Sequence, residues 1–182
     1  EKILDEFGYK QIYNDALLQM VKGREEKLKK GELSIEDFTI KHAVSFLHKL
    51  HEAGIKLYLA SGTDVEDVKR EATILGYAHL FDGGIYGAVG DVTKEAKKIV
   101  LDGILDNIGE QTGEQVVTFG DGPVEIRETC KRKGISVGLA SNEQRRYGLN
   151  ISKRERLIKA GANIVVPDFS QSDRLLKLIG IQ

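Results

Sequence analysis

Two carboxylates follow a short apolar run, and their types and spacing could serve a metal ion. The run at residues 116–119 ends at Gly120-Asp121, and Glu125 follows four residues later. Pro123 suits the first turn of a helix, because its fixed φ matches a helix and its missing N–H would have no partner there. We therefore expect a strand, an acidic turn and a helix. Two carboxylates are hard oxygen ligands that suit Mg²⁺, although Asp121 could equally serve as a helix cap.

A second polar turn, Ser61-Gly62-Thr63-Asp64, follows the apolar run at residues 55–60. A hydroxyl at a strand end, just before a helix, suits phosphate binding, because a helix N-terminus offers free N–H groups and a favourable dipole. Ser61, Gly62 and Thr63 are therefore candidate phosphate-binding residues. Capping of the helix by Thr63 or Asp64 is also expected, but capping does not account for Ser61 and Gly62.

Lys94 is predicted to open a helix near residues 94–107. A cation in the first turn opposes the helix dipole, so the presence of a lysine at this position needs a further explanation. Neutralising a phosphoryl group would be one. The alternative is a solvated lysine beside Lys97 and Lys98.

The elements that must position these residues alternate between strand and helix. Strands are expected at residues 55–60, 84–89, 115–119, 135–140 and 163–166, and helices at 64–75, 94–107, 124–133, 152–160 and 171–179. This order predicts right-handed crossovers and an α/β fold, a doubly wound, Rossmann-like parallel sheet with helices on both faces. Ligands of such sheets bind outside the carboxyl ends of the strands. The three polar segments could therefore converge.

The first part of the chain is helical and rich in charge. Helices are expected at residues 10–30 and 41–53, with a short one between them that starts at Ser34 and has Asp37 at capping-box spacing. His42, His48 and His51 fall on one of these helices. Because no acid or cysteine is arranged with them, we interpret them as surface or partly packed histidines.

Composition narrows the class of protein. The 182 residues suit one domain, or one domain with a small insertion. A formal charge of −1 gives no reason to expect nucleic acid or an anionic membrane as a partner. The single cysteine, Cys130, excludes an internal disulfide and is expected to pack within its helix. With no long apolar stretch and a charged start, we expect a cytoplasmic protein.

Taken in order, the polar segments resemble the second, third and fourth motifs of the haloacid dehalogenase superfamily. These are a strand ending in Ser61, Lys94 opening a helix, and Gly-Asp121 followed by Glu125. Residues 81–87 also resemble the segment between the second and third motifs, and the resemblance covers residues 41–169. It implies that Ser61 binds the transferring phosphoryl group and that Lys94 stabilises its charge. It also implies that Asp121 ligates Mg²⁺, with Glu125 a direct ligand or one acting through water.

The first motif of that superfamily, Asp-x-Asp-x-Thr, is absent. The nearest acidic cluster, Asp64-Val-Glu-Asp67, lies at a helix start. In the superfamily the first motif ends a central strand, between the strands that here end at Ser61 and Gly120, and supplies the nucleophile and the general acid/base. We interpret residues 1–40 as the remnant of a helical cap insertion and residues 41–182 as the α/β core without its first central strand. The nucleophile is then expected upstream, and the chain as given would be incomplete and inactive.

The resemblance implies a Mg²⁺-dependent phosphatase, a phosphoric monoester hydrolase that acts on a small phosphorylated metabolite through an aspartyl-phosphate. One alternative is a catalytically silent module that binds phosphate or a partner. Another is a different chemistry of the superfamily, such as a phosphomutase or a dehalogenase. Dehalogenases do not need the Mg²⁺ site that Asp121 and Glu125 would form. A dinucleotide-binding domain is disfavoured, because the chain lacks the required glycine fingerprint. The substrate and the oligomeric state are not specified by the sequence.

Overall fold

The computed structural model describes residues 6–88, 96–112 and 116–181. The chain divides into two compact units, Glu1–Phe38 and Thr39–Gln182. The first unit holds the helix α1 (Glu6–Lys29) and the 3₁₀ helix η1 (Ile35–Asp37). The expected capping box is present, because the Ser34 N–H donates to Asp37 Oδ2 at 2.7 Å. That this unit is the remnant of a cap stays a prediction.

The second unit alternates strands and helices, which confirms the predicted α/β class. Its strands are β1 (Tyr58–Asp64), β2 (Gly84–Ala88), β3 (Val117–Gly120), β4 (Ile135–Leu139) and β5 (Ile164–Val166). Its helices are α2 (Ala43–Glu52), α3 (Val65–Ile74), η2 (Ala78–Leu80), α4 (Ala96–Thr112), α5 (Pro123–Lys131), α6 (Ile151–Lys159) and α7 (Ser172–Leu178).

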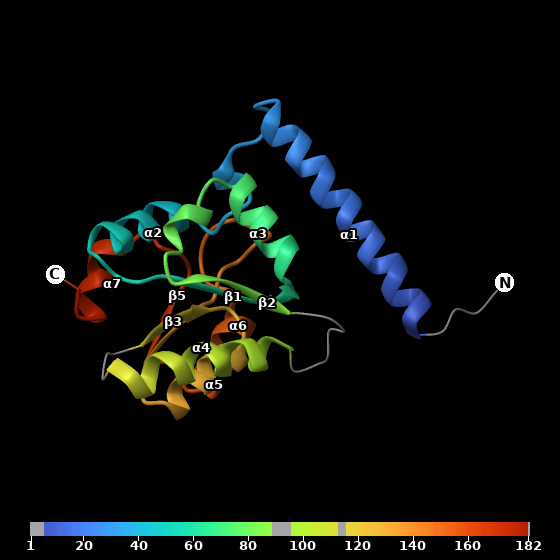
Figure 1. Cartoon of the computed structure of the whole chain (residues 1–182). Helices are drawn as coiled ribbons and strands as arrows, with labels where there is room; N and C mark the ends of the chain where they lie inside the picture. The colour runs from blue at the N-terminus through green and yellow to red at the C-terminus, as the bar shows by residue number, and fades with distance from the viewer. Residues whose placement is uncertain (1–5, 89–95, 113–115, 182) are drawn as a thin grey trace. The chain divides into compact units, whose positions relative to one another are not determined.

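The strands form two parallel sheets, one of β1 and β2 and the other in the order β3-β4-β5. Figure 1 shows α2, α3 and α7 on one face of the strands and α4, α5 and α6 on the other, as expected for a doubly wound arrangement. Within the described ranges, no backbone ladder joins β1 to β3. Each of these two strands therefore has one edge without a strand partner.

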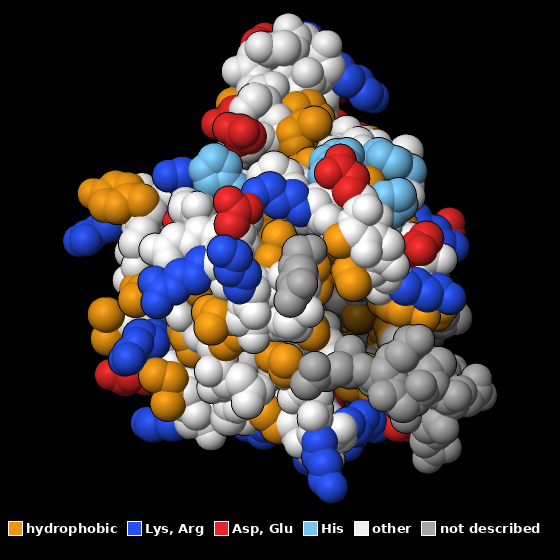
Figure 2. All heavy atoms as spheres, turned by 90° about the vertical axis from the view of Figure 1, so that its left-hand side faces the viewer, with side chains coloured by type: hydrophobic (Ala, Val, Ile, Leu, Met, Phe, Trp, Pro, Cys, Tyr) orange, Lys and Arg blue, Asp and Glu red, His pale blue; other side chains and the backbone are white. Residues whose placement is uncertain are grey.

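The surface of the chain carries its four histidines. His42, His48, His51 and His79 are all exposed, and Figure 2 shows histidine side chains on one face of the molecule. The rings of His48 and His79 are 6.1 Å apart. In the described part of the chain, no three His, Cys, Asp or Glu side chains gather to hold a metal ion. The exposure of His42, His48 and His51 agrees with their interpretation as surface or partly packed residues.

The core has two layers because strand residues alternate between the faces of the sheet. On β4, Val137 and Leu139 are buried in the larger cluster with Phe46 of α2, whereas Gly138 and the adjoining Ala140 face Leu157 of α6. The complete set of buried residues in the larger cluster is Phe46, Leu50, Leu57, Leu80, Val137, Leu139, Phe169, Leu175 and Ile179.

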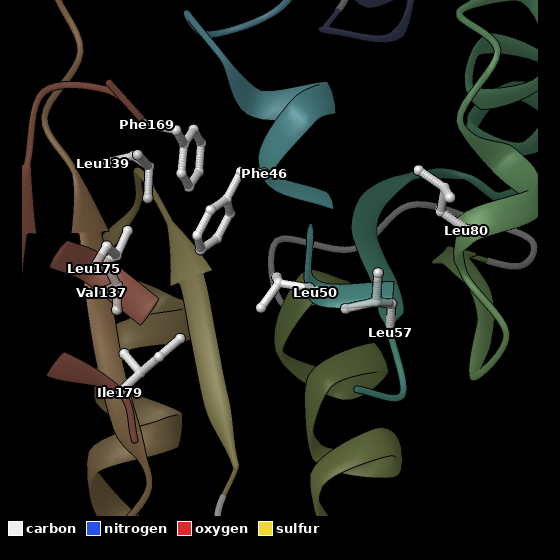
Figure 3. Packing of buried hydrophobic residues seen from close by; sticks show 9 residues of the cluster. All are labelled: Phe46, Leu50, Leu57, Leu80, Val137, Leu139, Phe169, Leu175 and Ile179. Carbon is white, nitrogen blue, oxygen red and sulfur yellow. The ribbon is translucent and has the colours of Figure 1, made fainter. Parts of the chain in front are cut away.

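Phe46 is the centre of this larger cluster. Its ring stacks on Phe169 at 4.8 Å and meets Phe119 edge-on at 5.4 Å. In Figure 3, Phe46 and Phe169 lie beside Leu139, while Leu50 and Leu57 lie close to each other. The cluster thus extends from the β3-β4-β5 sheet to the start of β1, so that side-chain packing links the two sheets.

Several element boundaries differ from the sequence expectation, among them the end of β1 at Asp64 instead of Ala60 and the end of α4 at Thr112 instead of Asn107. The strand expected to begin at Ile55 begins at Tyr58, because the Leu57 N–H donates to the Asp82 carboxylate at 2.9 Å instead of joining a ladder. The helix expected to stop at Gly134 ends earlier, and Lys133 adopts the left-handed conformation with a φ of 60°. Cys130 packs against the cluster of Ile126, Ala140 and Leu157, as expected.

Among the described residues, no helix combines the length and the apolar character needed to cross a membrane.

Candidate active site

The turn between β3 and α5 is held from beneath by Glu125. This side chain is only 3% exposed, and its Oε1 accepts the Gly122 N–H at 2.9 Å. Pro123 occupies the first turn of α5, as predicted. A Cβ added to Gly120 would lie 2.3 Å from Glu125 Cγ, so only glycine leaves room for this carboxylate. Glu125 therefore fixes the backbone on both sides of Asp121.

Asp121 itself extends away from this support. Its side chain is 53% exposed, in contrast to the buried Glu125. Its Oδ2 lies 3.1 Å from the Nζ of Lys153, a residue of α6. The structure therefore places a cationic group on the predicted metal ligand.

Lys153 is shared between two carboxylates. Besides Asp121, its Nζ contacts the Oε1 of Glu143, which lies in the loop after β4, at 2.5 Å. The Lys153 side chain is 15% exposed. Burial by itself lowers the pKa of this ammonium, but the hydrogen bonds to Glu143 and Asp121 outweigh it, and the pKa is raised. Lys153 remains a cation at neutral pH.

The loop and helix that carry Lys153 are locally ordered. Asn150 caps α6, because its side chain accepts the Lys153 N–H at 3.0 Å. The Ser141–Leu149 pair forms an isolated bridge that closes the loop containing Glu143. Both partners of the ammonium and the ammonium itself are thus on segments with defined backbone positions.

The candidate phosphate segment lies at the irregular end of β1. Ala60 pairs with Tyr86 and Asp64 pairs with Ala88, so Ser61, Gly62 and Thr63 together oppose the single residue between those partners. That residue is Gly87, where an added Cβ would lie 2.7 Å from the Thr63 carbonyl oxygen. Bulges of this kind re-aim side chains and are frequent next to active sites.

Hydrogen bonds within this segment distinguish the residue that caps α3 from the candidate phosphate-binding residues. The Ser61 hydroxyl accepts the Thr63 N–H at 3.2 Å. Asp64 caps α3, because its carboxylate accepts the Glu66 N–H at 2.9 Å. Asp64 is therefore the expected cap. Its carboxylate accepts one of the N–H groups at the start of α3 that the sequence suggested as donors to phosphate. Ser61 and Gly62 are half-buried and Thr63 is exposed, and their phosphate-binding role stays a prediction.

The structure brings some predicted residues together and leaves others apart. Asp121 and Glu125 meet at one turn, and Lys153 and Glu143, which sequence reasoning missed, join Asp121 there. Ser61 lies on the other sheet, and within the described ranges it shares no hydrogen bond or ion pair with that group. Lys94 lies outside the described residues.

The donor chemistry at Asp121 fits a hard cation. An exposed carboxylate on a rigid turn is a suitable oxygen ligand for Mg²⁺, and the Lys153 ammonium already stands where positive charge is favoured. One oxygen of Glu125 is engaged by the Gly122 N–H, which suits a ligand acting through water better than one in direct contact. Further ligands are needed, because the described part of the chain contains no group of three.

Parallel strands flanked by helices, with polar turns at their carboxyl ends, define a Rossmann-like α/β protein with a candidate phosphate and metal site. The family model of haloacid dehalogenase-like hydrolases matches residues 6–128, more than half of the chain. The protein therefore belongs to the haloacid dehalogenase-like hydrolase family, and the expected membership of that superfamily is confirmed.

Two solved structures share the fold. One is a predicted phosphatase from Clostridium acetobutylicum, with a TM-score of 0.60 and 20% identity over 75% of this chain and 59% of that one. The other is a haloacid dehalogenase-like family hydrolase from Streptococcus pneumoniae, with a TM-score of 0.55 and 18% identity over 76% of this chain and 58% of that one. The chain thus spans less than two thirds of either structure. No curated protein sequence matches it.

Proposed function

We propose that the whole protein is a Mg²⁺-dependent phosphatase that cleaves a small phosphorylated metabolite through an aspartyl-phosphate. The observation that carries this proposal is the Asp121 carboxylate, exposed at the end of β3 and fixed by the buried Glu125 beneath it. The fold is that of a hydrolase family, and a structure with the same fold is described as a predicted phosphatase.

The nucleophile of this proposal is an aspartate on a strand N-terminal to residue 1. Support comes from the edges of β1 and β3, each of which pairs with a strand on one side only in the described residues. Such edges accept a further parallel strand. A strand placed there would end between the Ser61 turn and the Asp121 turn, because the carboxyl ends of parallel strands lie at the same edge of a sheet.

In the proposed reaction, the aspartate carboxylate attacks phosphorus, the bond between phosphorus and the alcohol oxygen breaks, and that oxygen takes a proton from the general acid expected in the same upstream motif. Water then hydrolyses the acyl phosphate, releasing phosphate and regenerating the aspartate. The Ser61 hydroxyl would donate to a phosphoryl oxygen, and Lys94 would neutralise its charge. Asp121 would hold Mg²⁺ directly and Glu125 through water, and bound Mg²⁺ would stabilise negative charge on the transferring group.

The test is hydrolysis of p-nitrophenyl phosphate by the full-length protein, with Mg²⁺ and after chelation. Asp121→Asn should lower the Mg²⁺-dependent rate by about a hundredfold or more while the protein stays folded. Asp173→Asn is the matched control, because this carboxylate is exposed on α7 and pairs with Lys49; its rate should stay unchanged. Undiminished hydrolysis by Asp121→Asn would refute the assignment.

The same measurements separate the alternatives. A silent phosphate- or partner-binding module would show no turnover in any variant. A phosphomutase would transfer phosphate between positions of a substrate without releasing it. A dehalogenase would act on a haloacid and would not respond to chelation.

A further inference from the structure

The Lys153 ammonium lies beside Asp121, the proposed metal ligand, and places a positive charge there in the metal-free protein. It lies in the first turn of α6, where positive charge opposes the helix dipole. Its Nζ lies 3.1 Å from Asp121 Oδ2, and its side chain is 15% exposed. Two carboxylates offset the unfavourable position, and one of them is the proposed Mg²⁺ ligand. Packing of α6 alone does not require a lysine here, because Leu157 is the buried residue of this helix.

Glu143 gives this ammonium a second acceptor that is not a predicted metal ligand. The Glu143 side chain is 70% exposed and comes from the loop after β4. Asp121 comes from the turn after the neighbouring strand, β3. Lys153 can therefore release Asp121 and remain paired with Glu143, without becoming an unpaired, largely buried charge.

We propose that Lys153 is a built-in counter-cation of Asp121, which a divalent cation displaces toward Glu143 when it binds. This inference rests on the proposed function, because it takes Asp121 as the Mg²⁺ ligand. The ammonium orients the carboxylate in the metal-free protein, and it competes with the metal for the same oxygen. The affinity for Mg²⁺ is thus set by the balance of Asp121 and Glu143 as partners of one lysine.

The competition has a definite sign. Removing the ammonium removes a like charge from beside the bound cation and frees the Asp121 oxygen, so Lys153→Met should bind Mg²⁺ about five- to tenfold more tightly. Removing the alternative acceptor leaves the ammonium on Asp121 alone, so Glu143→Gln should bind Mg²⁺ several-fold more weakly. A lysine that merely supported the Asp121 turn would give the opposite result for Lys153→Met.

The experiment is calorimetric titration of the full-length protein with Mg²⁺, independent of turnover. Lys159→Met is the matched control, because Lys159 is an exposed lysine in the last turn of the same helix; its affinity should stay close to that of the wild type. The double variant Lys153→Met/Glu143→Gln isolates the mechanism. Glu143→Gln should have no further effect once Lys153 is gone, whereas a simple loss of negative charge would weaken binding in both backgrounds.

Asp121→Asn separates the failure of this inference from failure of the proposed function. If the wild type binds Mg²⁺ and Asp121→Asn does not, the ligand assignment holds, and unchanged or weaker binding by Lys153→Met then overturns the counter-cation alone. If Asp121→Asn binds as the wild type does, or if the wild type does not bind Mg²⁺, both proposals fail. Should Lys153→Met not fold, the exposed Glu143→Gln variant still decides, because unchanged binding by it contradicts the competition.

Discussion

Gly120→Ala tests whether Glu125 holds the Asp121 turn, because the substitution puts a methyl group into the space of that carboxylate. The new Cβ would lie 2.3 Å from Glu125 Cγ and 2.4 Å from Oε1. Glu125 is 3% exposed and has no open side toward which to yield, so it must leave the Gly122 N–H. A hydrogen bond to a charged group contributes about 1.5–3 kcal/mol. We therefore expect Gly120→Ala to lower the free energy of unfolding by about 2 kcal/mol.

The assay is urea unfolding followed by circular dichroism, with Gly103→Ala as the matched control. Nothing lies within 4 Å of a Cβ at Gly103, which is exposed within α4. The same chemical change there should raise stability by about 0.5–1 kcal/mol, since alanine favours a helix over glycine. Opposite signs at the two glycines would attribute the loss at Gly120 to the local contact with Glu125.

A double-mutant cycle identifies that contact. Glu125→Ala alone removes the same hydrogen bond to the Gly122 N–H and should cost about 2 kcal/mol. In the Glu125→Ala background the methyl group at Gly120 meets no carboxylate, so the two effects should differ from additivity by about 1–2 kcal/mol. If Gly120→Ala costs as much without Glu125 as with it, the carboxylate does not hold the turn and the reasoning is refuted.

Two further predictions concern the core and the acid side of stability. Phe46→Ala removes a side chain that is 1% exposed and touches two other rings. It should lower the free energy of unfolding in urea by about 3–5 kcal/mol. Leu178→Ala is the control, because this position is 57% exposed, and it should change stability by less than about 0.5 kcal/mol. Glu128 is 6% exposed and hydrogen-bonds to Lys131 and Arg132, which lower the pKa of its carboxyl from the ordinary 4.5 despite its burial. A lowered folded pKa stabilises the protein above pH 4.5, and this contribution is lost as the pH falls through the folded pKa. The stability difference between wild type and Glu128→Gln should therefore shrink below about pH 4.5; a difference that stays constant in unfolding curves between pH 3 and 7 would contradict it.

The sequence predicts the fold well because the determining signals are local. Helices and strands alternate with clear changes of apolar period, and Pro123 marks the start of α5. The start of β1 was wrong by three residues because a tertiary contact, the Leu57 N–H to Asp82, takes the place of a ladder hydrogen bond. The irregular pairing at Ser61 likewise depends on Gly87 of the neighbouring strand.

The residues of the candidate site likewise divide into those that local sequence signals predict and those whose contacts depend on the tertiary fold. Asp121 and Glu125 were found because one strand and one helix place both of them. Lys153 and Glu143 were missed because their link to Asp121 spans 32 residues between Asp121 and Lys153 and crosses from β3 to α6. The sequence did carry a signal, because a lysine in the first turn of a helix opposes the helix dipole, and Lys153 occupies such a position as Lys94 was expected to. Only the folded structure shows that Asp121 and Glu143 are the carboxylates that pair with Lys153.

The absence of a ladder between β1 and β3 in the described ranges has a consequence for alignment. Hydrogen-bond register fixes how far one strand slides along its neighbour in steps of whole residues, whereas apolar contacts have no such steps. The height of the Ser61 turn relative to the Asp121 turn is therefore set here by the volumes of side chains such as Phe46. A change of one core side chain can shift one turn past the other by a fraction of an ångström without breaking a hydrogen bond of either sheet. A strand seated between β1 and β3 would lock that sliding motion into a single register.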